Sequence, residues 1–135
     1  MITGGQPLTD ENYEKGNFFA PTVLANVTDE MKVSSEETFG PIAPIIQFET
    51  EKEVIKRANS SEYGLASYIF TKDASRIVRV SEALEYGIVG INDPLPTVAQ
   101  APFGGIKESG IGREGGHHGL SEYLEYKYLS MQIED

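Results

Sequence analysis

Blocks of apolar residues separated by amphipathic stretches predict an α/β fold for the middle of this chain. Residues 42–48 and 88–92 are almost wholly apolar and rich in β-branched side chains, which is typical of strands buried on both faces, and residues 65–71 form a further predicted strand. Between these strands, apolar positions recur with a helical period in residues 51–60 and 74–86. This order is typical of a parallel sheet with right-handed crossovers, here a partial three-layer sheet with flanking helices.

Local signals support both helices. Thr50 offers an N-cap oxygen and Glu53 follows three residues later, which completes a capping box. Asp73 is the predicted N-cap of the second helix, and Gly87 is its predicted C-terminal stop. The side chains expected to face inward from this second helix are Ile77, Val78, Val80 and Leu84.

The remaining segments have weaker patterns. Residues 1–17 are polar and are predicted to be irregular. Residues 18–27 are expected to form a short or edge strand, and residues 30–37 a helical turn or short helix. Residues 93–116 are rich in proline and glycine, so they are predicted to be a long irregular loop, a kind of segment that is usually functional. The chain is expected to end with a helix over 119–127 and a strand over 128–133.

The predicted sheet lacks partners within the chain. Three or four strands of buried type would leave unpaired backbone groups along an apolar edge. Two explanations stay open at this point. Either another chain covers that edge, or further sequence upstream completes the sheet.

Composition and charge exclude several classes of function. The formal net charge of the 135 residues is −10, and such a surface repels phosphate, which argues against nucleic acid and anionic membranes as partners. We see no apolar run long enough to span a bilayer and no secretory signal at the N-terminus, so a cytoplasmic location is expected. The chain has no cysteine, which excludes disulfides and thiol chemistry within it.

The first candidate site is the segment from Glu36 to Pro41. The carboxylate of Glu37 could accept two hydrogen bonds from a vicinal diol such as that of ribose. The ring of Phe39, two residues later in extended chain, would point the same way and could cover a flat heterocycle. From the spacing alone, a surface acid and a core phenylalanine are the favoured explanation.

The second candidate site is the segment from Ala101 to Gly110. Its glycines allow close approach of the backbone, and Phe103 stands between Pro102 and Gly104, which fixes its direction. The alternative is that this ring only packs the loop.

Two nearby patterns predict no site. Gly110, Gly112 and Gly115 spell G-x-G-x-x-G, but polar residues precede them where a dinucleotide-binding unit needs a buried strand. A close-packed turn is the favoured interpretation. His117 and His118 are adjacent and have no companion ligands, so we expect solvated residues at a helix start and no metal site.

Together the two candidate segments resemble the C-terminal part of NAD(P)-dependent aldehyde dehydrogenases, most closely the succinate-semialdehyde dehydrogenases. The similarity extends through Glu62–Ala66, Gly87–Asn92 and Gly110–Gly115 and covers nearly the whole chain. It implies that Glu37 holds the nicotinamide-side ribose of NAD or NADP and that Phe39 packs beside the nicotinamide. It also implies that Phe103 lines the aldehyde tunnel, with Thr97 contacting the distal carboxylate of the substrate.

The resemblance also implies a division of labour. Family members use a cysteine thiolate to attack the aldehyde and a glutamate to activate water, and both lie N-terminal to the matching part. We therefore expect a polar N-terminal segment (1–17), a partial catalytic domain (18–126) and a C-terminal oligomerisation strand (127–135) of a homo-oligomer. The chain alone is expected to be an inactive fragment with weak or no cofactor binding. The alternative is a non-catalytic oligomerisation module derived from the same family.

Overall fold

The computed structural model describes residues 2–13 and 15–133. The chain divides into two compact units, Met1–Thr50 and Glu51–Asp135. Both units contain helix and sheet, so the predicted mixed α/β class is confirmed. Among the described residues, the strands form three two-stranded sheets, two of them parallel, as expected for part of a larger sheet domain.

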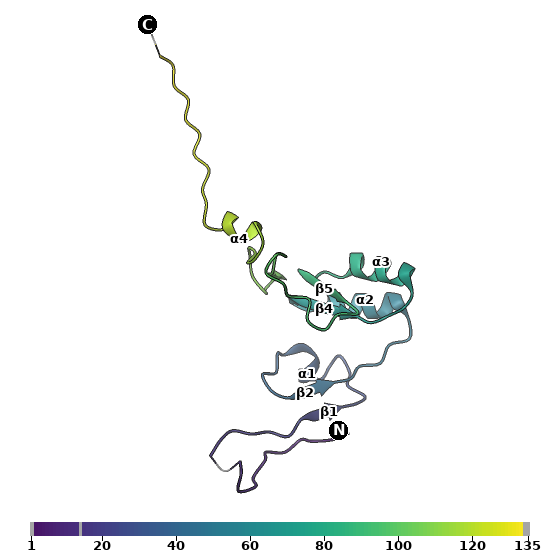
Figure 1. Ribbon diagram of the computed structural model, residues 1–135. Coiled ribbons are helices and arrows are strands. Elements are labelled where there is room, and N and C mark those ends of the chain that lie inside the picture. Colours follow the sequence, from purple (N-terminus) through teal and green to yellow (C-terminus); the bar gives the residue numbers. More distant parts are fainter. Residues whose placement is uncertain (1, 14, 134–135) are drawn as a thin grey trace. The chain divides into compact units, whose positions relative to one another are not determined.

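The first unit is built on a pair of parallel strands. These are β1 (Thr22–Leu24) and β2 (Ile42–Pro44), and the short helix α1 (Lys32–Ser35) lies between them in sequence (Figure 1). The predicted short strand and short helix are therefore confirmed. The predicted irregular N-terminal segment is attached to the rest of the unit by isolated bridges from Thr3 to Val23 and from Pro7 to Phe19.

The prediction that residues 42–48 are buried on both faces is wrong for this chain by itself. The strand ends at Pro44, whose ring nitrogen has no hydrogen to donate to a ladder, and Ile45 and Phe48 are about half exposed. Burial in the first unit centres instead on Thr22 and Val27. The Thr22 hydroxyl accepts a hydrogen bond from the Gly5 N–H and donates one to the Ala20 carbonyl, both at 2.8 Å, which satisfies this buried polar group.

The second unit contains the helices and the parallel strands that the sequence pattern predicts. The elements are α2 (Glu51–Asn59), β3 (Tyr63–Gly64), β4 (Ala66–Ile69), α3 (Ala74–Ala83), β5 (Ile88–Ile91), β6 (Ile106–Lys107) and α4 (His118–Ser121). Strands β4 and β5 are parallel, with Ala66 opposite Ile88 and Ile69 opposite Ile91. Strands β3 and β6 form a separate antiparallel pair. Helix α3 packs against β4, β5 and α2 (Figure 1).

Helix α3 starts where predicted and ends earlier than predicted. The Asp73 side chain accepts the Arg76 N–H at 3.0 Å, so the predicted N-cap is confirmed. The helix ends at Ala83 and not at Gly87, because Asn59 caps it from α2. The Asn59 amide donates to the Ala83 carbonyl at 2.7 Å and accepts the Glu85 N–H at 2.9 Å.

The inward face of α3 is only partly as predicted. Val80 is buried, with 7% of its surface exposed, whereas Val78 is 53% exposed and lies off the packed face. Positions 77, 80 and 84 are three and four residues apart, so they lie on one face of the helix. Position 78 is adjacent to 77 and therefore points in a different direction. The helical pattern was correct, but the apolar residues extend beyond the face that packs.

The C-terminal part differs most from expectation. The predicted helix over 119–127 is reduced to the four residues of α4. The structure places residues 125–133 in neither a helix nor a strand, so the predicted strand over 128–133 finds no partner among the described residues. Among the described residues, the structure has no helix that is long and apolar enough to cross a membrane.

Candidate functional site

The segment from Glu36 to Pro41 forms the connection between α1 and β2 in the first unit. Glu36 ends α1 by donating its N–H to the Lys32 carbonyl at 2.7 Å. At the other end, the Pro41 carbonyl accepts the Thr22 N–H at 2.8 Å, which attaches the connection to β1. The loop is thus held at both ends, while Glu37 and Phe39 between them are exposed.

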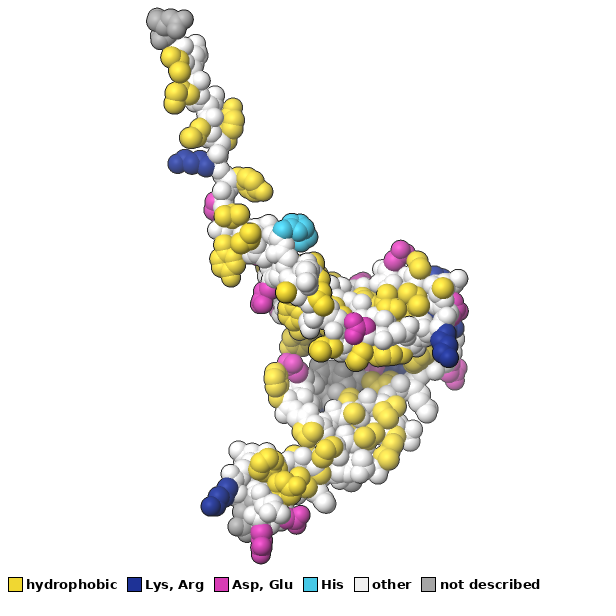
Figure 2. Space-filling model, viewed as in Figure 1, with side chains coloured by type: hydrophobic (Ala, Val, Ile, Leu, Met, Phe, Trp, Pro, Cys, Tyr) yellow, Lys and Arg dark blue, Asp and Glu magenta, His cyan; other side chains and the backbone are white. Residues whose placement is uncertain are grey.

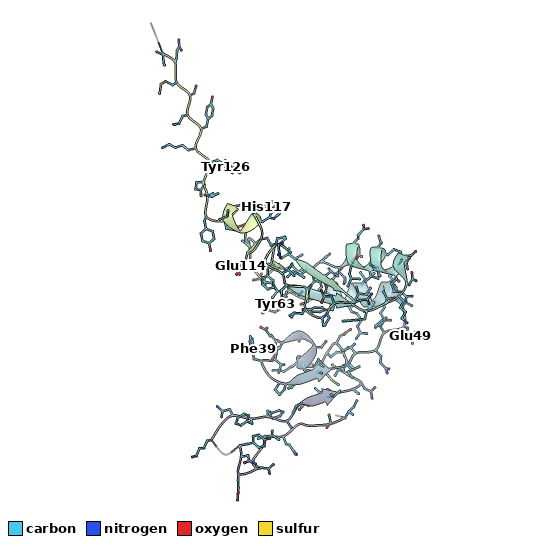
Figure 3. The ribbon with its side chains drawn as sticks, in the orientation of Figure 1. Phe39, Glu49, Tyr63, Glu114, His117 and Tyr126 are labelled. Atoms are coloured by element: carbon cyan, nitrogen blue, oxygen red, sulfur yellow. The ribbon has the colours of Figure 1, made fainter. Side chains whose placement is uncertain are left out.

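Phe39 is unusually open for an aromatic residue. Its surface is 93% exposed, and it projects outward from its loop (Figure 3). Covering a phenylalanine ring typically stabilises a complex by about 1.5–3 kcal/mol. The exposed Glu37 carboxylate lies two residues away in the same loop and can accept hydrogen bonds. This pair can therefore offer a flat apolar surface and an anionic acceptor to a ligand.

Phe103 stands at the base of a loop in the second unit. Its N–H donates to the Glu114 carbonyl at 2.8 Å, and the Glu114 N–H donates back to the Phe103 carbonyl at 2.7 Å. This two-bond bridge closes residues 104–113 into a loop. The half-buried Phe103 ring borders a hollow of about 800 Å³ whose other lining residues include Leu65, Arg113, Glu114, Leu120, Glu122 and Tyr123.

Glycines make the loop lie close to the β-strands of this unit. A side chain at Gly87, just before β5, would overlap the carbonyl oxygen of Gly104. A side chain at Gly105 would collide with Ser109 in the same loop. Only residues without a Cβ allow this approach, so the glycines beside Phe103 fix the path of the backbone on which its ring is carried.

Polar contacts of Lys107 and Ser109 attach the middle of the loop to the rest of the second unit. The Gly64 N–H donates to the Ser109 hydroxyl at 3.0 Å, which joins the loop to β3. Lys107 adopts a left-handed backbone with φ of 57°. Its ammonium group donates to the Asn59 carbonyl at 2.8 Å and lies 2.9 Å from the Glu85 carboxylate. A charge-assisted bond at the end of α2 is favourable because that helix end is partly negative.

Thr97 is not among the residues that line the hollow beside Phe103. It is exposed in the same long connection after β5. Glu37 and Phe39 lie in the first unit, and Thr97 and Phe103 lie in the second. Glu37 and Phe39 therefore share one exposed loop, whereas Thr97 does not line the hollow that Phe103 borders.

The G-x-G-x-x-G glycines have positive φ angles, and the adjacent histidines lie at the start of α4. Gly110, Gly112 and Gly115 have φ angles of 115°, 88° and 69°, which are turn conformations suited to glycine. The rings of His117 and His118 lie 3.8 Å apart at the start of α4. Within residues 2–13 and 15–133, no group of three or more histidine, cysteine, aspartate or glutamate side chains could hold a metal ion.

Arg113 is a residue of this loop that the sequence motifs did not reveal. Its guanidinium group donates to the carbonyls of Gly105 at 2.8 Å and Gly112 at 2.7 Å inside the loop that Phe103 begins. A long cation in a glycine-rich loop is a signal that could have revealed it, because bare carbonyls in such a loop need donors.

The comparison with known proteins extends over almost the whole chain. Residues 1–129 match the aldehyde dehydrogenase family. The chain belongs to this family. The resemblance inferred from the sequence motifs is therefore confirmed at the level of the family.

Three relatives illustrate the similarity. The succinate-semialdehyde dehydrogenase [NADP(+)] of Escherichia coli strain K12 is 57% identical over 118 residues, which are 87% of this chain and 24% of that protein. The 3-sulfolactaldehyde dehydrogenase of Pseudomonas putida is 51% identical over 131 residues, which are 97% of this chain and 26% of that protein. A crystal structure of betaine aldehyde dehydrogenase from Staphylococcus aureus in complex with NAD+ is 47% identical, with a TM-score of 0.88 over 93% of this chain and 25% of that chain.

The chain thus spans about a quarter of the length of the relatives it matches. The fold of the partial domain agrees with that of intact family members. The relatives carry three different aldehydes in their names at similar identity to this chain, so kinship at this level does not select one substrate.

Proposed function

We propose that this chain supplies one part of the active site of an NAD(P)-dependent aldehyde dehydrogenase. In this proposal Glu37 and Phe39 contact the nicotinamide end of the cofactor, and Phe103 forms part of the wall of the aldehyde tunnel. The observation that carries the proposal is the 93% exposure of Phe39 beside an exposed carboxylate in a chain of this family. An apolar ring held out on an anchored loop has its contact surface available for a ligand.

The residues present fit the nicotinamide end of the cofactor. The Glu37 carboxylate can accept hydrogen bonds from both ribose hydroxyls, and the Phe39 ring can lie against a flat heterocycle. The cofactor, when bound, supplies hydride acceptance. Either NAD or NADP suits these two contacts, because neither contact involves the adenosine ribose.

For the aldehyde we propose succinate semialdehyde. The support is the hydroxyl of Thr97, which can donate to a distal carboxylate, in a chain whose relatives include a succinate-semialdehyde dehydrogenase. Thr97 is exposed in this chain. In this proposal its loop takes up the substrate-binding conformation only when it packs against the other part of the active site. Phe103 would exclude water from one side of the substrate and direct its chain.

The chain alone is proposed to be catalytically inactive. Oxidation through a covalent intermediate needs a nucleophile, and the 135 residues contain no cysteine. Its contribution is to bind and orient, which requires the other part of the active site. We expect no NAD(P)H formation from succinate semialdehyde by the purified chain.

A chimeric enzyme tests this function directly. The matching quarter of the E. coli succinate-semialdehyde dehydrogenase [NADP(+)] is replaced by residues 1–135, and NADPH formation is followed by absorbance in the near ultraviolet. We expect turnover in the chimera. Glu37→Gln and Phe39→Ala should raise the KM for the cofactor about tenfold, because each removes a contact of roughly 1.4 kcal/mol or more.

Two controls make the result decisive. Glu36 is adjacent to Glu37 in the chain, and Glu36→Gln should leave the cofactor KM unchanged. Phe103→Ala should change the aldehyde KM and leave the cofactor KM unchanged. A chimera that turns over equally well with Glu37→Gln and Phe39→Ala would overturn the assignment of the cofactor contacts.

A second candidate function is a non-catalytic oligomerisation module. The observation that favours it is a C-terminal segment whose apolar side chains are exposed to solvent (Figure 2). Those at least 65% exposed beyond α4 are Tyr123, Leu124, Tyr126, Tyr128, Leu129, Met131 and Ile133. Gel filtration distinguishes the two candidate functions. A discrete dimer or tetramer of the chain supports the oligomerisation module. A monomer or an aggregate supports the interpretation as one part of an active site.

A further inference from the structure

One guanidinium group donates to two backbone carbonyls inside the loop that begins at Phe103. Arg113 donates from Nη1 to the Gly105 carbonyl at 2.8 Å and to the Gly112 carbonyl at 2.7 Å. One of these carbonyls lies two residues after Phe103, and the other belongs to the residue before Arg113. The group therefore ties the first residues of the loop to its last ones.

The buried position of Gly105 makes this contact significant. Gly105 is buried in the second unit, and its carbonyl receives a charged donor. A buried carbonyl that loses its donor is costly, and hydrogen bonds from a charged group are stronger than neutral ones. The backbone beside Phe103 is therefore expected to move if this donor is removed.

The aliphatic stem of Arg113 adds a second restraint. A side chain at Gly104 would lie 2.8 Å from Cδ of Arg113 and 2.6 Å from the Gly112 carbonyl, so the stem lies directly against the Gly104 backbone. On the other side of this pair, Phe103 and Glu114 are joined by two backbone hydrogen bonds. Arg113 therefore restrains Phe103 from two sides. It packs on Gly104, the residue after Phe103, and it precedes Glu114, which is hydrogen-bonded to Phe103.

We propose that Arg113 is a positioning residue that fixes the orientation of the Phe103 ring. Its importance for the aldehyde rests on the proposed function of Phe103 as a wall of the tunnel. The positioning itself depends only on the contacts of Arg113 with Gly104, Gly105 and Gly112. The restraint on the Phe103 ring and the contact of that ring with the aldehyde can therefore be tested separately.

The first experiment measures the mobility of position 103 in the full chain. The sequence contains no tryptophan, so Phe103→Trp introduces a single tryptophan reporter. In this background, Arg113→Gln should lower the fluorescence anisotropy and raise the acrylamide quenching constant about twofold, as expected for a loop that has lost its restraint. Arg113→Lys should give values between those of the reporter protein and Arg113→Gln, because a lysine keeps the charge but has a shorter reach.

The matched control is Arg79→Gln in the same reporter background. Arg79 is bonded to Glu51 between α2 and α3, away from the loop, so the reporter should be unchanged. Far-ultraviolet circular dichroism checks that each variant keeps its fold. If Arg113→Gln unfolds the chain, the reporter mobility in Arg113→Lys is the deciding measurement. Reporter mobility that is the same with Arg113 intact, with Arg113→Lys and with the control substitution would refute the positioning role.

The second experiment uses the chimeric enzyme described above. Arg113→Lys should raise the KM for succinate semialdehyde about tenfold with little change in the cofactor KM, since a misplaced wall impairs substrate positioning. A mobile reporter with an unchanged aldehyde KM would show that Arg113 positions Phe103 but that Phe103 does not contact the substrate. An immobile reporter overturns the inference whatever the kinetics.

Discussion

The side chain of Asn92 pairs with the backbone of Thr71 through two hydrogen bonds. The amide nitrogen donates to the Thr71 carbonyl at 2.9 Å, and the amide oxygen accepts the Thr71 N–H at 2.9 Å. Asn92 follows β5 and Thr71 lies just beyond β4, so the pair extends the contact between these parallel strands past their ends. Asn92 also has a φ of 54°, a left-handed conformation that asparagine tolerates better than most residues.

Two substitutions at Asn92 separate these effects. Asn92→Gly removes both hydrogen bonds but permits the positive φ, so it should destabilise the second unit by about 1 kcal/mol, given that the bonds are exposed to water. Asn92→Ala adds backbone strain of roughly 1 kcal/mol. Urea unfolding followed by circular dichroism should rank the original chain as most stable, then Asn92→Gly, then Asn92→Ala. Equal stability of all three proteins would contradict this account.

Gly87 is expected to tolerate no side chain. In Gly87→Ala the new Cβ would overlap the Gly104 carbonyl, so the loop that carries Phe103 must shift. Such overpacking should cost about 2 kcal/mol of unfolding free energy. Gly40→Ala is the matched control, because a Cβ there meets nothing within 4 Å and φ is not positive. Denaturation midpoints that are lowered equally by both substitutions would rule out the close approach as the cause.

Ser67 and Ser109 should respond in opposite directions to loss of the hydroxyl. The Ser67 hydroxyl is buried in β4 and finds no hydrogen-bond partner among the described residues. Ser67→Ala removes an unsatisfied polar atom and should be neutral or stabilise the chain by up to about 1 kcal/mol. Ser109→Ala leaves the Gly64 N–H without its acceptor and should destabilise by about 1–2 kcal/mol. Thermal melts of the two variants check the signs, and a marked loss of stability in Ser67→Ala would be the contradicting result.

The local elements of the fold could be predicted from the sequence because their causes are local. The Asp73 cap, the periodicity of α2 and α3 and the β-branched run of β5 each lie within a few residues. The end of α3 could not, because Asn59, 24 residues away, caps it. The exposure of Ile45 and Phe48 also could not, because an apolar run does not show whether other residues of the chain will cover it.

The candidate site divides in the same way. Glu37, Phe39 and Phe103 were recognised through motifs, and the openness of Phe39 agrees with a contact residue. Their roles remain predictions. Arg113 was not recognised, because its contacts with Gly105 and Gly112 arise from the folding of a glycine-rich loop that carries no periodic pattern.

The ion cluster at Glu51 makes a pH-dependent prediction. The Glu51 carboxylate at the start of α2 bridges Arg79 at 2.9 Å and Arg76 at 3.0 Å in α3. The hydrogen bond from Arg79, and then that from Arg76, holds the pKa of Glu51 below its ordinary value, and Glu51 raises the pKa of Arg79, which stays charged throughout. Because the folded-state pKa is lowered, this contribution to stability is fully present above the unfolded-state pKa of about 4.3 and disappears as the pH falls through the folded-state value.

Glu51→Gln should therefore lower the unfolding free energy at pH 7, and the difference from the original chain should shrink steadily below about pH 4. The effect should be small and should weaken in high salt, because both arginines are about half exposed and Glu51 is partly exposed. Glu36→Gln is the control, since its partner Lys32 is 3.5 Å away and both side chains are more than half exposed. Urea titrations at pH 7 and pH 3 measure both variants. A Glu51→Gln deficit that persists unchanged at pH 3 would mean that the side chain acts through packing and not through its charge.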